Sequence, residues 1–175
     1  MKFIFTVTIL FLLSEMLIFN FNTESNINNW RIVDDVVMGG RSNGNFKINT
    51  EGHGEFSGSI SLENNGGFSS VRYDFKTLNS SQYSSFKIRL KGDGKSYQFR
   101  VKSSYSQRYS YVYKFETSGE WETIIIPFDK MTPRFRGYDL DQPNFSGEQM
   151  EQIAFLIGNK KAQKFKLLID TISLQ

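Results

Sequence analysis

Two short segments of the sequence combine residue types that could bind a ligand. Segment 30–42 contains two adjacent carboxylates, a Gly-Gly pair and an arginine, and segment 65–72 contains a second Gly-Gly pair and a second arginine. An arginine can bind a carboxylate through two parallel hydrogen bonds, and the backbone amides of consecutive glycines can bind an anion. The two segments therefore predict a surface that binds a partner or ligand. Its candidate residues are Asp35, Met38, Gly39, Gly40, Arg41, Ser42, Gly66, Gly67, Phe68, Arg72 and Arg136.

The adjacent carboxylates Asp34 and Asp35 have two interpretations. They could ligate a metal, although a hard cation needs about six oxygen ligands and this pair supplies only part of that set. Alternatively, Asp35 stabilises the loop by accepting hydrogen bonds from the Gly39-Gly40 amides or by pairing with an arginine. We favour this structural interpretation, and we predict no metal site and no cofactor.

The glycine pairs and the arginines also allow both a functional and a structural interpretation. The glycine pairs could form an anion-binding nest, or they could be turns that need positive φ, and neither has phosphate-loop spacing. The arginines at positions 41, 72 and 136 could bind a ligand, or they could pair internally with nearby aspartates. The structural interpretation is favoured for both groups, only slightly so for the arginines.

A row of tyrosines, Tyr109, Tyr111 and Tyr113, alternates along a predicted strand. Aromatic rings on one face of a strand could stack on sugar rings, but the same alternation is typical of core packing. The sequence leaves both interpretations open for this candidate sugar-stacking face.

Residues suited to catalysis are few. His53 is the only histidine, it lies between two glycines in a predicted loop, and the chain has no cysteine. A Ser-His-Asp triad would depend on His53 alone, and the sequence contains no nucleophile-elbow motif. The carboxylates show no pattern that identifies a glycosidase pair. We therefore expect that the protein is not an enzyme.

The charge pattern argues against a nucleic-acid partner. The net charge is +3, from 21 Lys and Arg and 18 Asp and Glu, and the basic residues are scattered among the acidic ones. A nucleic-acid-binding protein would be expected to concentrate Lys and Arg in a run or on one face. This pattern predicts a mixed, solvated surface.

Short segments of alternating polarity, separated by turns rich in Gly and Asn, must position these candidates. The chain has 17 Phe, 8 Tyr and 2 Trp, a composition that favours strands. We expect strands at 55–62, 68–75, 84–90, 97–102, 109–115, 121–128, 153–157 and 165–174. Eight or nine strands at this spacing predict an all-β, two-sheet β-sandwich of the jelly-roll type.

Three local features give more specific expectations. Gly92-Asp93-Gly94 predicts a hairpin between segments 84–90 and 97–102, because Asp-Gly pairs suit hairpin turns. The isoleucines at 124–126 predict a strand that is buried on both faces. Segment 146–152 predicts a short helical turn, since a serine at a capping position is followed by Glu and Gln.

The sequence divides into an apolar leader at residues 1–22, a polar linker at 23–29 and one domain at 30–175. The leader has Lys2 followed by a hydrophobic run, as in a signal peptide, and the run is too short for a stable membrane span. The first arginine is Arg31, which disfavours a mitochondrial presequence. We therefore expect export to the periplasm or secretion.

An ordered series of motifs resembles the complex I intermediate-associated protein 30 family. It runs from Trp30 to the end of the chain and consists of Trp30, Asp35-x-x-Met38-Gly39-Gly40-Arg41-Ser42, Gly66-Gly67-Phe68-x-x-Val71-Arg72, Gly92-Asp93-Gly94-x-x-Tyr97, Trp121, Ile126-Pro127-Phe128, Pro133 and Arg136-Gly137. The resemblance implies a β-sandwich of the galactose-binding-like type. It also implies a chaperone-like role, because mitochondrial members assist assembly of the respiratory NADH dehydrogenase.

The resemblance and the residues together give two hypotheses. The first is a non-enzymatic domain that binds a protein partner, with complex I subunits or assembly intermediates as the implied candidates. The second is an exported carbohydrate-binding module of the same fold, whose partner would be a glycan.

Overall fold

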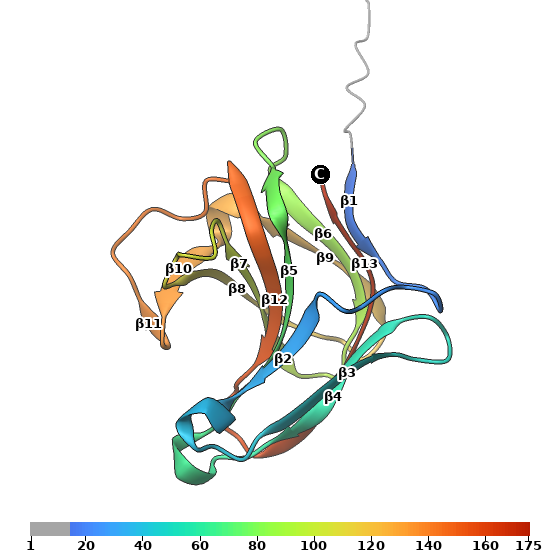
Figure 1. Cartoon of the computed structure of the whole chain (residues 1–175), viewed down its shortest axis with the longest axis vertical. Helices are drawn as coiled ribbons and strands as arrows, with labels where there is room; N and C mark the ends of the chain where they lie inside the picture. The colour runs from blue at the N-terminus through green and yellow to red at the C-terminus, as the bar shows by residue number, and fades with distance from the viewer. Residues whose placement is uncertain (1–14) are drawn as a thin grey trace, which may run out of the picture.

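Thirteen strands, arranged in two antiparallel sheets, make up the computed structural model, which describes residues 15–175 apart from the side chains of Val37 and Met38. The two sheets curve around a shared core (Figure 1). No α-helix occurs among the described residues, so none there could span a membrane. The structure confirms the predicted all-β, two-sheet sandwich.

Six strands form the first sheet. Its order is β3 (Asn43–Ile48), β4 (Gly54–Ile60), β13 (Gln163–Leu174), β6 (Ser85–Lys91) and β9 (Trp121–Pro127), with β1 (Met16–Asn20) pairing with β13 beside this path.

Seven strands form the second sheet. Its order is β11 (Tyr138–Asp139), β10 (Thr132–Phe135), β8 (Ser110–Glu116), β7 (Ser96–Lys102), β12 (Gln149–Ile157), β5 (Ser69–Asn79) and β2 (Trp30–Asp34). Three short 3₁₀ turns complete the structure: η1 (Asp35–Met38), η2 (Glu63–Asn65) and η3 (Phe128–Lys130).

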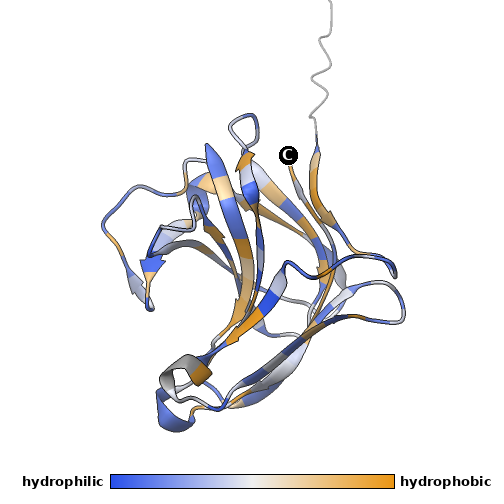
Figure 2. Cartoon of the chain, viewed as in Figure 1, coloured by the Kyte–Doolittle hydropathy of each residue, from blue (hydrophilic) through white to orange (hydrophobic). Residues whose placement is uncertain are grey.

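The core lies between the sheets because alternate residues of each strand point inward. Phe86, Ile88 and Leu90 of β6 face Tyr97, Phe99 and Val101 of β7, and each is at most 1% exposed. Figure 2 shows hydrophobic residues concentrated in the strands, while η2 and much of the loop beside β10 and β11 are hydrophilic. The predicted inward faces of both strands are therefore confirmed.

The predicted hairpin at Gly92-Asp93-Gly94 is wrong, because β6 and β7 belong to different sheets. Asp93 anchors a crossover between the sheets: its carboxylate accepts hydrogen bonds from the Tyr97 hydroxyl and the Lys166 amide, both at 3.0 Å. These contacts come from both sheets. They explain why this turn does not pair its neighbouring strands.

Two further expectations need correction. The helical turn predicted at 146–152 is absent: residues 146–148 are irregular and β12 begins at Gln149. The hydroxyl of Ser80, which follows β5, donates a hydrogen bond to the Gly147 carbonyl at 2.7 Å. In β9, Ile126 is fully buried but Ile125 is 42% exposed. β9 is an edge strand with one face towards solvent, so its isoleucines alternate between core and surface.

The leader predicted at residues 1–22 does not end where the sequence indicated. Residues 1–14 lie outside the described part of the chain, but β1 pairs with β13 and Phe21 is only 4% exposed. Phe19 and Phe21 pack against Trp30 with ring centroids 5.4 Å apart in both cases. The apolar run at 16–21 is therefore an edge strand with a core-facing side, and the folded domain includes it.

Candidate functional site

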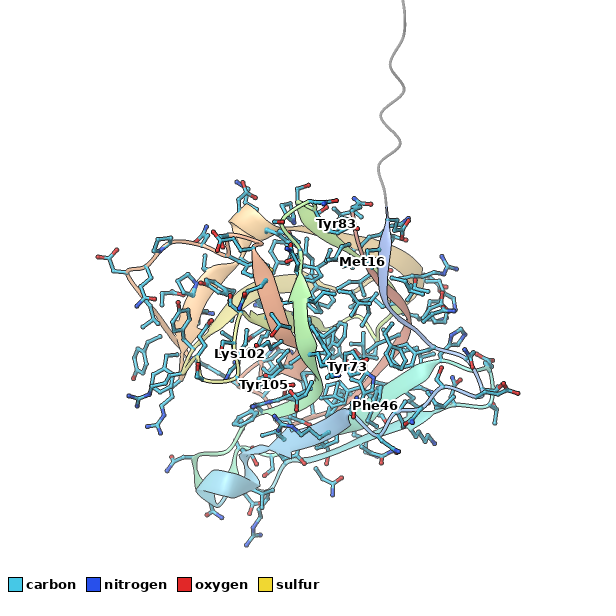
Figure 3. All side chains as sticks on the ribbon, turned by 45° about the horizontal axis from the view of Figure 1, so that its top comes forward. Met16, Phe46, Tyr73, Tyr83, Lys102 and Tyr105 are labelled. Carbon is cyan, nitrogen blue, oxygen red and sulfur yellow. The ribbon has the colours of Figure 1, made fainter. Side chains whose placement is uncertain are left out.

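A groove of about 720 Å³ crosses the face of the seven-stranded sheet that points away from the core. Along the strands that form its floor, side chains point alternately into the core and into the groove. Val71, Phe99 and Phe155 point into the core, and the residues next to them in the sequence point into the groove. The floor consists of Ser70 and Arg72 of β5, Gln98, Arg100 and Lys102 of β7, and Gln152, Ala154 and Leu156 of β12. Figure 3 shows the two faces: Lys102 lies to the left of β5, whereas Tyr73 lies to its right.

Two loop regions wall the groove. One wall contains Leu62 beside η2 and residues 66–68, and the other contains residues 134–137 at the end of β10. In Figure 1, η2 and β11 both lie to the left of β12. Arg136 and Gly137 have φ values of 49° and 88°, so the second wall turns sharply. A left-handed conformation is uncommon for a residue with a side chain, and it occurs preferentially at functional loops.

Phe135 is the aromatic centre of the second wall. The guanidinium carbons of Arg108 and Arg136 lie 5.6 Å and 5.4 Å from the centre of its ring. Both arginines line the groove. The ring therefore holds two cations at the groove by cation–π attraction.

The cations of the floor affect one another. Burial, and then the charges of Arg72 and Arg134, lower the pKa of Arg100 to about 10, so this guanidinium remains protonated at neutral pH. Burial followed by the charge of Arg31 lowers the pKa of Arg72, and burial followed by Arg72 and Arg31 lowers the pKa of Lys102. The groove thus concentrates positive charge in a partly desolvated place.

Asp35 connects the first wall, through hydrogen bonds, to the loop that follows η1. Its side chain is fully buried, and its carboxylate accepts hydrogen bonds from the Ser42 amide (3.0 Å), the Ser42 hydroxyl (2.5 Å) and the amides of Gly67 and Phe68. Burial would raise the pKa of Asp35, but these hydrogen bonds outweigh burial and hold it below its ordinary value.

This network corrects the partners that we expected for Asp35. The amides come from Ser42, Gly67 and Phe68, and the Gly40 amide donates instead to the Asp35 backbone carbonyl at 3.1 Å. Gly67 of the second glycine pair and the following Phe68 therefore supply amides to an anion, and that anion is the protein's own carboxylate, while the Gly66 amide donates to the Glu63 carbonyl.

The predicted surface residues fall into three groups. Gly66, Gly67, Phe68, Arg72 and Arg136 line the groove. Asp35, Gly40 and Ser42 are buried behind its first wall, so none of these three side chains or backbones is exposed to a partner. Gly39 and Arg41 are exposed outside the groove, where Arg41 pairs with Glu63 at 2.8 Å, and the Met38 side chain lies outside the described residues.

Tyr111 and Tyr113 lie on the core side of β8, and Tyr109 immediately precedes this strand. Tyr111 packs against the Phe145 ring at 5.1 Å, Tyr113 packs against the core, and the Tyr109 and Tyr111 hydroxyls lie 3.3 Å apart. The alternation places Ser110 of the same strand in the groove instead. A sugar in the groove would therefore not meet these three rings.

Sequence reasoning missed nine polar residues that line the groove: Ser70, Gln98, Arg100, Lys102, Arg108, Ser110, Arg134, Gln152 and Lys160. A signal was available in β7, whose outer face reads Gln98, Arg100 and Lys102 and carries no acid. Its significance depends on which strands lie beside it, and the sequence does not specify the strand order.

His53 and the acidic residues offer no second site. The His53 ring lies 4.5 Å from the Trp121 ring, and its Nδ1 lies 3.4 Å from Asp170 on the six-stranded sheet, away from the groove. Within residues 15–175, no group of three or more His, Asp or Glu side chains is arranged to hold a metal ion.

Replacing Gly40 with alanine tests the packing behind the first wall. A Cβ at this position would lie 2.3 Å from Asp35 Oδ1, so we expect the free energy of unfolding to fall by about 1–3 kcal/mol in chemical denaturation. In an Asp35→Ala background the same substitution should cost much less, because the clashing carboxylate is gone. An equal cost in both backgrounds would contradict this packing.

Comparison with known proteins places this geometry in context. The model of the family described as Complex I intermediate-associated protein 30 matches residues 19–169, which confirms the resemblance. Among curated proteins, no sequence matches this chain.

Solved structures with the same fold include carbohydrate-binding modules and domains of two agarases. The family 11 module of the cellulosomal cellulase Lic26A-Cel5E of Clostridium thermocellum has a TM-score of 0.65 and 21% identity, covering 92% of this chain and 94% of that chain. The Clostridium thermocellum family 11 module in complex with a β-1,3-1,4-mixed-linked tetrasaccharide has a TM-score of 0.63 and 20% identity, covering 91% and 94%. A variant of the family 29 module CBM29-2 has a TM-score of 0.52 and 13% identity, covering 93% and 91%. These similarities confirm the galactose-binding-like sandwich.

Proposed function

We propose that this chain, which belongs to the complex I intermediate-associated protein 30 family, is a non-catalytic module that binds a saccharide chain in its groove. The observation that carries the proposal is the groove itself, an open channel built on a sheet and lined by both polar and apolar side chains. Rigid strands hold such side chains in place, which reduces the entropy lost on binding. The solved modules of the same fold support the proposal, since one of them is in complex with a tetrasaccharide.

The absence of catalysis is part of the proposal. The residues that line the groove include no His, Asp or Glu, so its described lining offers no carboxylate pair for glycosidic chemistry. The sole histidine lies on the other sheet, against Trp121. A binding role fits these residues better than hydrolysis.

Blocking the groove tests the proposal. Ala154 lies in the floor between Arg72 and Arg100, and the Ala154→Trp variant would fill the channel. By titration calorimetry against a panel of neutral and acidic polysaccharides, we expect at least one glycan to bind the wild type and the variant to bind it about 100-fold more weakly or not at all.

A matched control is available on the other sheet. Ile125 is 42% exposed in β9, so Ile125→Trp adds the same ring far from the groove and should leave glycan affinity unchanged. Wild-type affinity in Ala154→Trp, or a panel without any bound glycan, would contradict the proposal.

The family match favours a second candidate function, in which the same groove binds a protein partner during assembly of respiratory complex I. The tagged protein would be crosslinked mildly in its host and purified. Recovery of NADH dehydrogenase subunits that is lost in Ala154→Trp would support this role. Recovery of envelope proteins or glycans would instead fit export, which remains our proposal for the localisation.

A further inference from the structure

The groove carries a charge imbalance that binding of a neutral sugar does not require. Seven of its lining residues are Arg or Lys, and none is Asp or Glu. Within residues 15–175, the only ion pair formed by these seven is that of Arg134 with Asp139. On the other sheet, by contrast, Lys87, Arg89 and Lys166 each pair with a carboxylate. Asp74, at the edge of the floor, offsets part of the charge of Arg72 and Lys102, but it already pairs with Arg31 at 2.8 Å. The groove therefore keeps an excess of positive charge.

Two of these cations, Arg72 and Arg100, are close together in the floor, and their charged forms are destabilised there. Arg72 and Arg100 sit on either side of Ala154, because β12 pairs Ala154 with both residues in register. Two strand spacings separate their backbones by about 10 Å. Burial lowers the pKa of both arginines; the charges of Arg72 and Arg134 lower the pKa of Arg100 further, whereas for Arg72 the further lowering comes from Arg31 and is partly offset by Asp74. An anion lying over Ala154 would offset this repulsion and restore part of the lost solvation.

The geometry suits a carboxylate attached to a polar ring. The Gln98 side-chain oxygen accepts hydrogen bonds from Arg100 Nη2 at 2.7 Å and Nε at 3.1 Å, which fixes the plane of the guanidinium. A fixed guanidinium can bind a carboxylate through two hydrogen bonds. Across Leu156 from Gln98, the Ser70 hydroxyl is buried and has no hydrogen-bond partner among the described residues. A sugar hydroxyl would supply one.

We propose that the ligand of this groove is an acidic saccharide, a chain of uronic-acid units whose carboxylates lie on Arg72 and Arg100 and whose hydroxyls meet Ser70, Gln98 and Gln152. This assignment rests on the proposed saccharide-binding function and gives that function a substrate class. The pair of guanidiniums at Phe135 extends the positive lining beyond the floor, so successive acidic units meet further cations.

Two other kinds of anion fit the lining less well. Single-stranded nucleic acids are usually bound by stacking their bases on open aromatic faces, and here the Phe135 ring lies against two guanidiniums. An acidic peptide would satisfy the arginines, but it lacks the ring hydroxyls that match the buried hydroxyl and amides between the cations. The mixture of Arg, Ser and Gln side chains on the floor is what favours the saccharide.

Four probes distinguish these possibilities by calorimetry with the full-length protein. They are oligogalacturonate, neutral mixed-linkage β-glucan, dextran sulfate and poly-glutamate. We expect oligogalacturonate to bind at least about tenfold more tightly than each of the other three at 0.15 M salt, where non-specific attraction is screened. Equal or tighter binding of neutral glucan would overturn the acidic assignment while leaving the proposed function intact. Failure of all three saccharides would overturn both.

The results with dextran sulfate and poly-glutamate also test the uronic-acid assignment. Binding of dextran sulfate as tight as that of oligogalacturonate would show recognition of charge alone and would overturn the uronic-acid assignment. Binding of poly-glutamate as tight as that of oligogalacturonate would assign the groove to an acidic peptide instead, against the proposal.

Variants of Arg100, with an arginine of the other sheet as the control, test whether the carboxylate of the ligand binds at Arg100. Arg100→Gln should weaken oligogalacturonate binding about tenfold or more, and Arg100→Lys should rescue it only in part, because lysine lacks the planar fork. Arg89→Gln, on the other sheet, should bind as the wild type does. Arg100→Gln should also keep or raise the melting temperature, since it removes a repelled charge, whereas a structural arginine would lower it. Unchanged affinity in Arg100→Gln, with the melting temperature retained, would overturn the proposal.

Discussion

Replacing Asp35 with alanine is expected to lower the free energy of unfolding by about 3 kcal/mol or more, because the change leaves several donors without a partner. The donors are the Ser42 amide and hydroxyl and the amides of Gly67 and Phe68. They connect the loop after η1 to the first wall of the groove. Chemical denaturation followed by tryptophan fluorescence would measure the loss.

A matched control lies one residue away. Asp34 accepts a single hydrogen bond from the Gly44 amide, at 2.9 Å, so Asp34→Ala should cost only about 1 kcal/mol. Similar small losses in both variants would contradict the view that Asp35 holds the loop in place.

The same carboxylate gives a pH dependence with a definite sign. The folded state lowers the pKa of Asp35, so its contribution to stability is complete above the ordinary pKa of aspartate, about 3.9, and is lost as the pH falls through the folded value. Asp35→Asn cannot titrate at this position. The stability difference between wild type and Asp35→Asn should therefore shrink as the pH falls below about 4, and a difference that grows there would contradict this account.

Removing residues 1–22 is expected to abolish stable folding, whereas removing residues 1–14 should leave the described domain intact. The longer deletion takes away β1 and with it Phe19 and Phe21, which pack on the stacked pair of Trp30 and Tyr73. Truncation of one buried phenylalanine costs about 3–5 kcal/mol, and the total stability of a domain is about 5–15 kcal/mol.

Thermal unfolding followed by circular dichroism would compare the two deletions. A full-length Phe21→Ala variant separates the effect of the core side chain from that of strand pairing, and it should unfold at an intermediate temperature. A chain starting at residue 23 with the melting temperature of the chain starting at residue 15 would show that β1 adds nothing to the domain.

The sequence predicted the fold better than it predicted the site. Alternation in β6 and β7 indicated the inward faces correctly, because the pattern is local. It did not show that these two consecutive strands belong to different sheets, since that depends on contacts such as the one between Asp93 and Lys166. The apolar run at 16–21 was equally ambiguous, because hydrophobicity alone does not separate an edge strand from a leader.

The candidate site was predicted only in part, for a similar physical reason. Basic residues on the outer faces of β6 and β7 look alike in the sequence. In the structure Arg89 lies 3.3 Å from Asp170, while Arg100 forms no ion pair with any described residue. The difference arises from the strands beside them, which bring carboxylates to one sheet and further arginines to the other. The identification of Arg72 and Arg136 depended on their neighbouring glycine motifs, and the structure places both in the groove.

The most direct test of the central claim is a two-dimensional amide NMR titration of the ¹⁵N-labelled domain with trigalacturonate. We predict that the largest shift changes occur at Gly67, Arg72, Arg100, Ala154 and Arg136, which line the groove on different strands and loops. Changes confined to the six-stranded sheet, around Arg89 and Trp121, would contradict the assignment of the groove as the binding site.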